Sequence, residues 1–182
     1  KIDTGNLSSA NSPTLPSANQ RASSTGQLYD PTTRIPLRPL FMDRLRHTII
    51  RMERAQLMAA VCVIAFTFPK NPDLSADIKK QVDQHLVRRL TGSVREGDTV
   101  AKLQDDEYAL ILEEIKETSV LEKIEEKILL GIGTPILVQG QRIEVKPILG
   151  SSLFPRDGDD PLSLLNQADI AMRTIRFHQS SS

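Results

Sequence analysis

The segment from residue 95 to residue 113, REGDTVAKLQDDEYALILE, constrains the fold of this chain more than any other. Apolar, β-compatible residues in 99–103 and 108–112 flank a polar break at 104–106. The pattern predicts two antiparallel strands joined by a tight turn that carries carboxylates at its tip. Such a tip can offer oxygen ligands to Mg²⁺, which prefers one or two carboxylates together with phosphate oxygens. The alternative is a solvated polar turn without a chemical role.

Helical and strand patterns alternate around this hairpin. Apolar residues at three- and four-residue spacing predict amphipathic helices, and an apolar run that is β-branched in its middle predicts a central strand covered on both faces. The expected elements are a helix at 37–54, the central strand at 57–68, a helix at 74–90, the hairpin, a helix at 117–130, a short strand pair and a helix at 161–176. This order predicts an α+β sandwich of βαββαβ type, with a central antiparallel-containing sheet flanked by helices.

Local signals refine the ends of these elements. Ser75 is expected to cap the second helix, and the short strand pair is expected to turn at Gln139 and Gly140. Pro147 is read as part of the second strand of that pair, which predicts a sheet edge or a bulge there. The last helix is expected to bury one stripe, made of Leu164, Leu165, Ala168, Met172 and Ile175.

Composition limits the classes of function. Lys plus Arg and Asp plus Glu number 23 each, so no global field favours nucleic acid or an anionic membrane. Cys62 lies in an apolar run and is expected to be a reduced core residue, which fits a cytoplasmic location. Residues 1–28 are rich in small polar residues and predict a disordered or extended linker before a domain at 29–178, with a tail at 179–182. We expect no membrane span within this chain, and the three histidines share no metal-ligand spacing.

The hairpin resembles the signature of the GGDEF domain, the fold of diguanylate cyclases. In that family a strand is followed by G-G-D/E-E-F and a second apolar strand, and here the corresponding residues are Gln104, Asp105, Asp106, Glu107 and Tyr108. Three further segments resemble family motifs in the same order, and these are residues 30–38 (DPTTRIPLR), 154–158 (FPRDG) and 164–172 (LLNQADIAM). The resemblance therefore extends from about residue 29 to residue 176 and implies the family fold.

The resemblance also implies which catalytic parts are missing. A diguanylate cyclase joins two GTP molecules held by separate protomers, and two carboxylates hold its Mg²⁺. Glu107 matches one of these carboxylates, but Ala65 occupies the other position and Thr67 replaces its acidic neighbour. Gln104 and Asp105 replace the glycines that let the backbone approach the phosphates. We therefore expect no cyclase activity, no cofactor and no metal, the alternative being weak GTP binding supported by Glu107.

Other nucleotide-binding positions are also altered. The guanine-reading residues of the family fall near residues 71–73 and Lys80, and neither is securely matched. Arg176 can replace the phosphate-binding lysine of the last helix, whereas the downstream arginine of the family falls on Ser180.

One family site is retained. Arg95 and Asp98 form an R-x-x-D motif five residues before the signature, the spacing of the inhibitory site that binds cyclic di-GMP. Arginine offers a planar fork to a guanine edge or a phosphate, and aspartate accepts hydrogen bonds from guanine. The resemblance places Arg51 or Arg54 on a second surface of that site. Lys123 or Lys127 could add positive charge. The alternatives are a solvated turn with a weak ion pair and a chance motif, since residues 156–159 also read R-x-x-D.

Three hypotheses follow from the sequence. The first is an inactive GGDEF domain that acts as a cyclic di-GMP receptor and passes its signal to an adjacent domain or a second copy of the chain. The second is a dimerisation or docking module that binds no nucleotide and regulates a fused or partner domain, such as an EAL phosphodiesterase. The third is a weak residual diguanylate cyclase. None of them involves nucleic acid.

Overall fold

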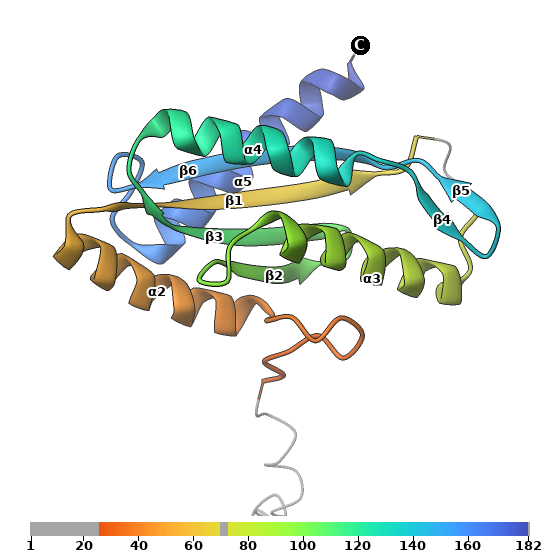
Figure 1. Ribbon diagram of the computed structural model, residues 1–182, viewed down its shortest axis with the longest axis horizontal. Helices are drawn as coiled ribbons and strands as arrows, with labels where there is room; N and C mark the ends of the chain where they lie inside the picture. The colour runs from red at the N-terminus through yellow and green to blue at the C-terminus, as the bar shows by residue number, and fades with distance from the viewer. Residues whose placement is uncertain (1–25, 70–72, 182) are drawn as a thin grey trace, which may run out of the picture.

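The computed structural model describes residues 26–69 and 73–181, which form a four-stranded sheet with two helices on each face (Figure 1). The elements, labelled as in Figure 1, are α2 (Arg38–Ala55), β1 (Met58–Thr67), α3 (Ala76–Ser93), β2 (Thr99–Gln104), β3 (Glu107–Ile115), α4 (Thr118–Ile132), β4 (Ile136–Val138), β5 (Gln141–Ile143), β6 (Lys146–Phe154) and α5 (Pro161–Ser180). The sheet has the order β2-β3-β1-β6, and each neighbouring pair is antiparallel. The predicted α+β sandwich is therefore confirmed.

Strand β1 is the centre of the core. Its even-numbered residues from 60 to 66 pack with α3 and α4, and its odd-numbered residues from 59 to 65 pack with α2 and α5. This alternation is the period of a strand whose side chains point to opposite faces, and it explains why the segment reads as continuously apolar. Cys62 is buried on the α3 and α4 side, where burial raises the pKa of its thiol well above the usual range. The prediction of a reduced core cysteine is consistent with this position.

The helices follow the predicted patterns with one correction. The Ser75 side chain accepts a hydrogen bond from the Ile78 backbone N–H at 3.3 Å, which confirms the predicted cap. Helix α5 runs to Ser180, beyond the predicted end, and Ile175 is 40% exposed, so its predicted burial is wrong. The reason is geometric, because the last turns of α5 extend past the sheet and Met172 is the last residue of the helix that is buried (Figure 1).

The region after α4 differs from the prediction. The turn at Gln139 and Gly140 joins β4 to β5 as expected, but Pro147 lies in a separate strand, β6. Strand β6 is an edge of the main sheet, so the predicted edge position of Pro147 holds although its predicted strand was wrong. Helix α5 crosses β6 closely at Gly150, where a Cβ atom would lie 2.1 Å from the Met172 backbone nitrogen. Glycine is therefore required there by contact between the two backbones.

Two expectations concern the ends of the chain and the membrane. Most of the predicted linker lies outside the residues that the structure describes. Within residues 26–69 and 73–181, no helix combines the length and the apolar character needed to cross a bilayer. The location of the protein stays a prediction.

Candidate functional site

The hairpin turn lies between β2 and β3 and carries the expected carboxylates. Asp106 has φ of 60°, a left-handed conformation that favours glycine and that aspartate tolerates better than most residues. Its carbonyl accepts a hydrogen bond from the Phe66 backbone N–H at 3.0 Å, which joins the turn to the end of β1. Burial raises the pKa of the Asp106 carboxyl, and the charge of nearby Lys79 opposes that change. Asp105 is exposed at the tip.

The position of the missing carboxylate is next to the retained one. Ala65 of β1 is directly opposite Glu107 of β3 in the antiparallel register, and it is 1% exposed among the residues that pack against α2 and α5. Side chains opposite each other in such a pair have Cβ atoms about 4.5–5.5 Å apart. A carboxylate at position 65 would therefore lie beside that of Glu107. The methyl group that is present offers no ligand.

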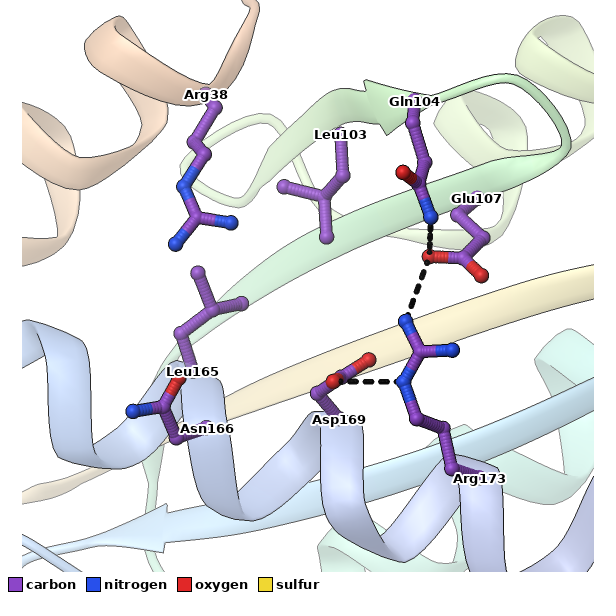
Figure 2. Close-up of a pocket in the computed structure, with 8 residues that line it drawn as sticks. All are labelled: Arg38, Leu103, Gln104, Glu107, Leu165, Asn166, Asp169 and Arg173. Carbon is purple, nitrogen blue, oxygen red and sulfur yellow. Dashed lines mark hydrogen bonds and ion pairs between the residues drawn. The ribbon is translucent and has the colours of Figure 1, made fainter.

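The Glu107 carboxylate is bound by basic and amide side chains (Figure 2). Gln104 Nε2 donates to Glu107 Oε2 at 2.6 Å, and Arg173 Nη2 lies 3.5 Å from the same oxygen. Arg176 Nη1 lies 3.6 Å from Oε1, so Arg176 of α5 pairs with Glu107. Asp169 holds Arg173 at 2.9 Å from the opposite side. The Glu107 side chain is 8% exposed, and its charge is compensated by two half-exposed guanidinium groups.

This arrangement does not fit Mg²⁺. The ion prefers octahedral oxygen coordination by carboxylates, water and phosphate, and here one carboxylate faces two guanidinium groups. The Thr67 hydroxyl, which could add an oxygen, donates to the Lys146 carbonyl at 3.3 Å. In the described part of the chain, no group of three or more His, Cys, Asp or Glu side chains could hold a metal ion.

A buried polar triad under the hairpin was not found from the sequence. Asp83 of α3 accepts hydrogen bonds from Lys102 Nζ at 2.7 Å and from the Tyr108 hydroxyl at 2.9 Å. Burial and the Asp83 charge raise the pKa of Tyr108, whose ring also packs edge-on against Phe66. Burial lowers the pKa of Lys102, but the hydrogen bond and charge of Asp83 raise it on balance. The signature tyrosine is therefore a structural residue of the core.

The segment before α2 is held by a short carboxylate-centred turn. Asp30 Oδ2 accepts hydrogen bonds from the backbone N–H and the hydroxyl of Thr33 at 2.7 and 2.6 Å. Arg34 follows in a left-handed conformation with φ of 64°, which favours glycine. Arg38 at the start of α2 lines a cavity of about 120 Å³ together with Glu107 and Arg173 (Figure 2).

The R-x-x-D motif forms a turn before β2, and its carboxylate is buried. Asp98 is 4% exposed at its side chain, and its two oxygens accept hydrogen bonds from the backbone N–H groups of Arg95 at 2.9 Å and Glu113 at 3.0 Å. The Arg95 side chain is 61% exposed and donates from Nη2 to the Glu113 carbonyl at 2.6 Å. Asp98 therefore stabilises the turn and is not solvated. Arg95 Nε lies 3.8 Å from Asp98 Oδ2, which is the weak ion pair of the alternative interpretation, in a turn whose residues 95–97 are exposed.

The structure brings Arg51 to this motif. Arg51, Asp98 and Glu113 line one cavity of about 310 Å³, and Arg95, Asp98 and Glu113 line a neighbouring cavity of about 190 Å³. Arg54 is exposed in the last turn of α2 and lines neither cavity. The two lysines of α4, at positions 123 and 127, are likewise exposed and line neither cavity.

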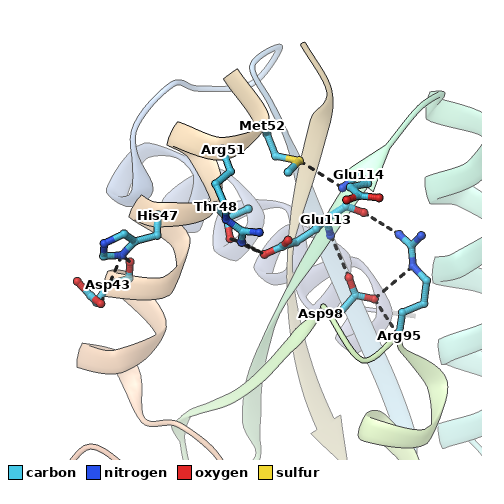
Figure 3. A network of polar contacts seen from close by, with 9 residues as sticks. All are labelled: Asp43, His47, Thr48, Arg51, Met52, Arg95, Asp98, Glu113 and Glu114. Atoms are coloured by element: carbon cyan, nitrogen blue, oxygen red, sulfur yellow. Dashed lines mark hydrogen bonds and ion pairs between the residues drawn. The ribbon is translucent and has the colours of Figure 1, made fainter. Parts of the chain in front are cut away.

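Glu113 is the residue of this region that the sequence analysis missed. Its carboxylate lies 2.5 Å from Arg51 Nη2 and accepts the Thr48 hydroxyl at 2.7 Å (Figure 3). Its backbone contacts both Arg95 and Asp98, as described above. The available signal was the pair of glutamates at 113 and 114, which breaks the alternation of the strand.

Of residues 71–73, near which the guanine-reading position of the family falls, the structure describes Asp73, which is exposed. Lys80 is exposed on α3, and the Ser180 hydroxyl donates to the Arg176 carbonyl at 3.0 Å. In the second R-x-x-D segment, Arg156 forms two hydrogen bonds with its neighbour Asp157, at 2.8 and 2.9 Å.

Comparison with known proteins places this geometry in a family. The family model described as "Diguanylate cyclase, GGDEF domain" matches residues 27–181. The chain belongs to the GGDEF family. A curated relative, diguanylate cyclase TpbB of Pseudomonas aeruginosa, is 29% identical over 147 residues, which are 79% of this chain and 34% of TpbB. The GGDEF domain thus spans about a third of the length of that relative.

Solved structures agree with the family assignment. A structure of TpbB that comprises only its GGDEF domain has a TM-score of 0.76 and 28% identity, and the match covers 80% of this chain and 87% of that chain. The coiled coil and GGDEF domain of DgcB from Caulobacter crescentus, solved in complex with c-di-GMP, has a TM-score of 0.72 and 15% identity, with 88% of this chain and 84% of that chain covered. The second likeness is one of fold.

Proposed function

We propose that this GGDEF domain is catalytically inactive. The observation that carries the proposal is the pairing of Ala65 with Glu107 across β1 and β3, which leaves one carboxylate where the cyclase reaction needs two. Arg173 and Arg176 compensate the charge of the carboxylate that remains. A divalent ion would have to displace both guanidinium groups from a side chain that is 8% exposed.

The positive role that we propose is reception of cyclic di-GMP through Arg95 and Asp98, with Arg51 on the second surface. Cyclic di-GMP offers two phosphodiesters and two guanine edges, and guanidinium forks bind both kinds of group. The two arginines line adjacent cavities that share the R-x-x-D turn. DgcB, which has the same fold, was solved in complex with c-di-GMP, and this supports the ligand class. No cofactor enters this proposal.

Isothermal titration with cyclic di-GMP tests the receptor role. The wild-type chain should bind, and Arg95→Ala should weaken binding at least tenfold, since a hydrogen bond to a charged group contributes about 1.5–3 kcal/mol and about 1.4 kcal/mol is tenfold. Arg156→Ala is the matched control, because Arg156 belongs to the other R-x-x-D segment and pairs with Asp157. Equal loss in both variants, or no binding by the wild type, would contradict the receptor role.

A parallel assay with GTP and Mg²⁺ tests the absence of catalysis. We expect no cyclic di-GMP to form, and the same result for Glu107→Ala. Product that forms with the wild type and disappears with Glu107→Ala would instead establish a residual cyclase.

One observation favours a second candidate, a docking or dimerisation module without a nucleotide. Arg95, Asp98 and Arg51 are all engaged in contacts within the chain. Binding of cyclic di-GMP must therefore replace these contacts within the chain by contacts with the ligand. No binding by either nucleotide in the titrations would favour this second candidate, with a fused domain or a second copy as the partner.

A further inference from the structure

We infer that Glu113 sets the affinity of the R-x-x-D site by occupying both of its arginines in the unliganded protein. The inference rests on the proposed function, because it concerns the same ligand and the same surface. Glu113 lies between the two arginines, with Arg51 on the α2 side and Arg95 on the other (Figure 3). It belongs neither to the R-x-x-D motif nor to the signature of the hairpin.

The contacts of Glu113 involve each part of the site. The carboxylate accepts hydrogen bonds from Arg51 at 2.5 Å and from the Thr48 hydroxyl at 2.7 Å, while the backbone carbonyl accepts one from Arg95 at 2.6 Å. The backbone N–H donates to Asp98 at 3.0 Å. A phosphate or guanine that binds these arginines must take the place of the Glu113 oxygens. Glu113 is 13% exposed at its side chain, so it cannot simply be solvated where it lies.

Glu113 lies at a β-bulge near the end of β3. Between β1 and β3 the register shifts, so that Met58 pairs with Ile115 and Ala60 pairs with Leu112, which inserts one extra residue into β3. Glu114 has φ of 54°, a left-handed conformation that costs a residue other than glycine free energy. The bulge sends Ile115 to the α3 and α4 side, whereas Glu113 keeps the face of Ala109 and Ile111, toward α2.

Charge in the two cavities also favours competition. The arginines that line them are Arg44, Arg51 and Arg95, and the carboxylates are Glu96, Asp98, Glu113 and Glu114. An anionic ligand therefore meets no excess of positive charge until a carboxylate is neutralised or displaced. Glu113 is the carboxylate in direct contact with Arg51, so its replacement should have the largest effect.

The test is the affinity for cyclic di-GMP of Glu113→Gln. Glutamine keeps an oxygen that can accept from Thr48 and Arg51, so the fold should be retained while the charge is lost. We expect a roughly two- to fivefold lower Kd, about the contribution of a partly exposed ion pair. Glu96→Gln is the matched control, since Glu96 lines the same cavity, is exposed and forms no ion pair within the described residues. Its effect should be clearly smaller.

The outcomes separate this inference from the proposed function. Binding by the wild type with an unchanged Kd in Glu113→Gln, or an equal change in Glu96→Gln, would overturn the inference and leave the receptor role standing. Binding by Glu113→Gln but not by the wild type would contradict the receptor role of the wild-type domain, although it would show that Glu113 opposes binding. Absence of binding by both proteins, with native circular dichroism, would overturn the inference and the receptor role together. Thr48→Val, which removes one contact of the Glu113 carboxylate and no charge, should shift the Kd in the same direction.

Discussion

Introducing a carboxylate by Ala65→Asp is the sharpest test of the proposed loss of a metal site. Ala65 is 1% exposed, faces Glu107 across the strand pair and packs against α2 and α5. An added carboxylate would therefore lie in a buried environment beside a charge of the same sign. We expect the variant to be less stable than the wild type in the absence of a divalent ion.

The expected size follows from the spacing of the strands. Opposite Cβ atoms are about 4.5–5.5 Å apart, and two unit charges about 5 Å apart repel by roughly 3 kcal/mol at an effective dielectric constant of about 20. Arg173 and Arg176, at 3.5 and 3.6 Å from the Glu107 oxygens, will offset part of this repulsion. Desolvation of the added carboxylate destabilises the folded state further. The net loss of unfolding free energy should therefore be about 2–4 kcal/mol.

Urea unfolding of four proteins measures the effect. They are the wild type, Ala65→Asp, Glu107→Gln and the double variant, whose double-mutant cycle should give a coupling of about 3 kcal/mol between the two positions. Mg²⁺ at about 100 times its Kd should then stabilise Ala65→Asp by about 2.7 kcal/mol and leave the wild type unchanged. A coupling below about 0.5 kcal/mol, which is the usual limit for independent sites, would refute the inferred proximity of the two side chains. Equal stabilisation of the wild type by Mg²⁺ would refute the inference that its single carboxylate does not hold the ion.

Three further predictions concern stability. Gly150→Ala should lower the unfolding free energy by about 3 kcal/mol or more because α5 leaves no room for a methyl group, whereas Gly92→Ala, in open space on α3, should have no such cost; urea unfolding of both checks this. Arg34→Gly should raise the Tm, because the left-handed backbone conformation at this position costs arginine roughly 1 kcal/mol more than glycine. An unchanged Tm would contradict this prediction. Because the pKa values of Lys102 and Tyr108 are raised in the folded state, that state binds more protons than the unfolded state above about pH 10. The contribution of these groups to the unfolding free energy should therefore be fully present below that pH and fall as the pH rises through the folded pKa values. Denaturation at pH 8 to 11 measures this fall, which should be smaller for Tyr108→Phe.

The helices and the hairpin could be predicted because their signals are local. Apolar periodicity identified the four helices, and the polar break between two apolar runs identified the turn between β2 and β3. Strand β6 was missed as a separate element because residues 134–154 contain several short apolar patches with no long polar break between them. Only pairing with β1 distinguishes it from the β4 and β5 hairpin.

The residues that tertiary packing brings together in the site could not be predicted from their spacing in the sequence. The register that places Ala65 opposite Glu107 depends on strand pairing across residues distant in sequence. Arg173 reads as an exposed position on an amphipathic helix, and only the packing of α5 on the sheet brings it to the hairpin. Asp83 in the same way reads as a polar residue of α3, although the fold buries it between Lys102 and Tyr108.

The bulge at the end of β3 determines the face of the sheet on which Ile115 lies. Odd-numbered residues of β3 before the bulge, such as Ala109 and Ile111, pack on the α2 and α5 side, but Ile115 packs on the α3 and α4 side. One inserted residue therefore reverses the alternation, so Ile115 packs in the core on the α3 and α4 side while Glu113 still faces Arg51. Strict period-two reading of the strand gives the wrong face for Ile115.

The two ends of β3 use the same chemistry with opposite functional consequences. At its start, guanidinium groups of α5 compensate the Glu107 carboxylate, and this removes the ligand that a metal would need. At its end, the Glu113 carboxylate compensates Arg51, and this removes the cation that an anionic ligand would need. Because Lys plus Arg equals Asp plus Glu over the whole chain, no long-range field offsets this local neutrality. If the domain binds an anionic dinucleotide as proposed, the ligand must replace the Glu113 contacts, and a neutral substitution at that residue measures their effect on the affinity.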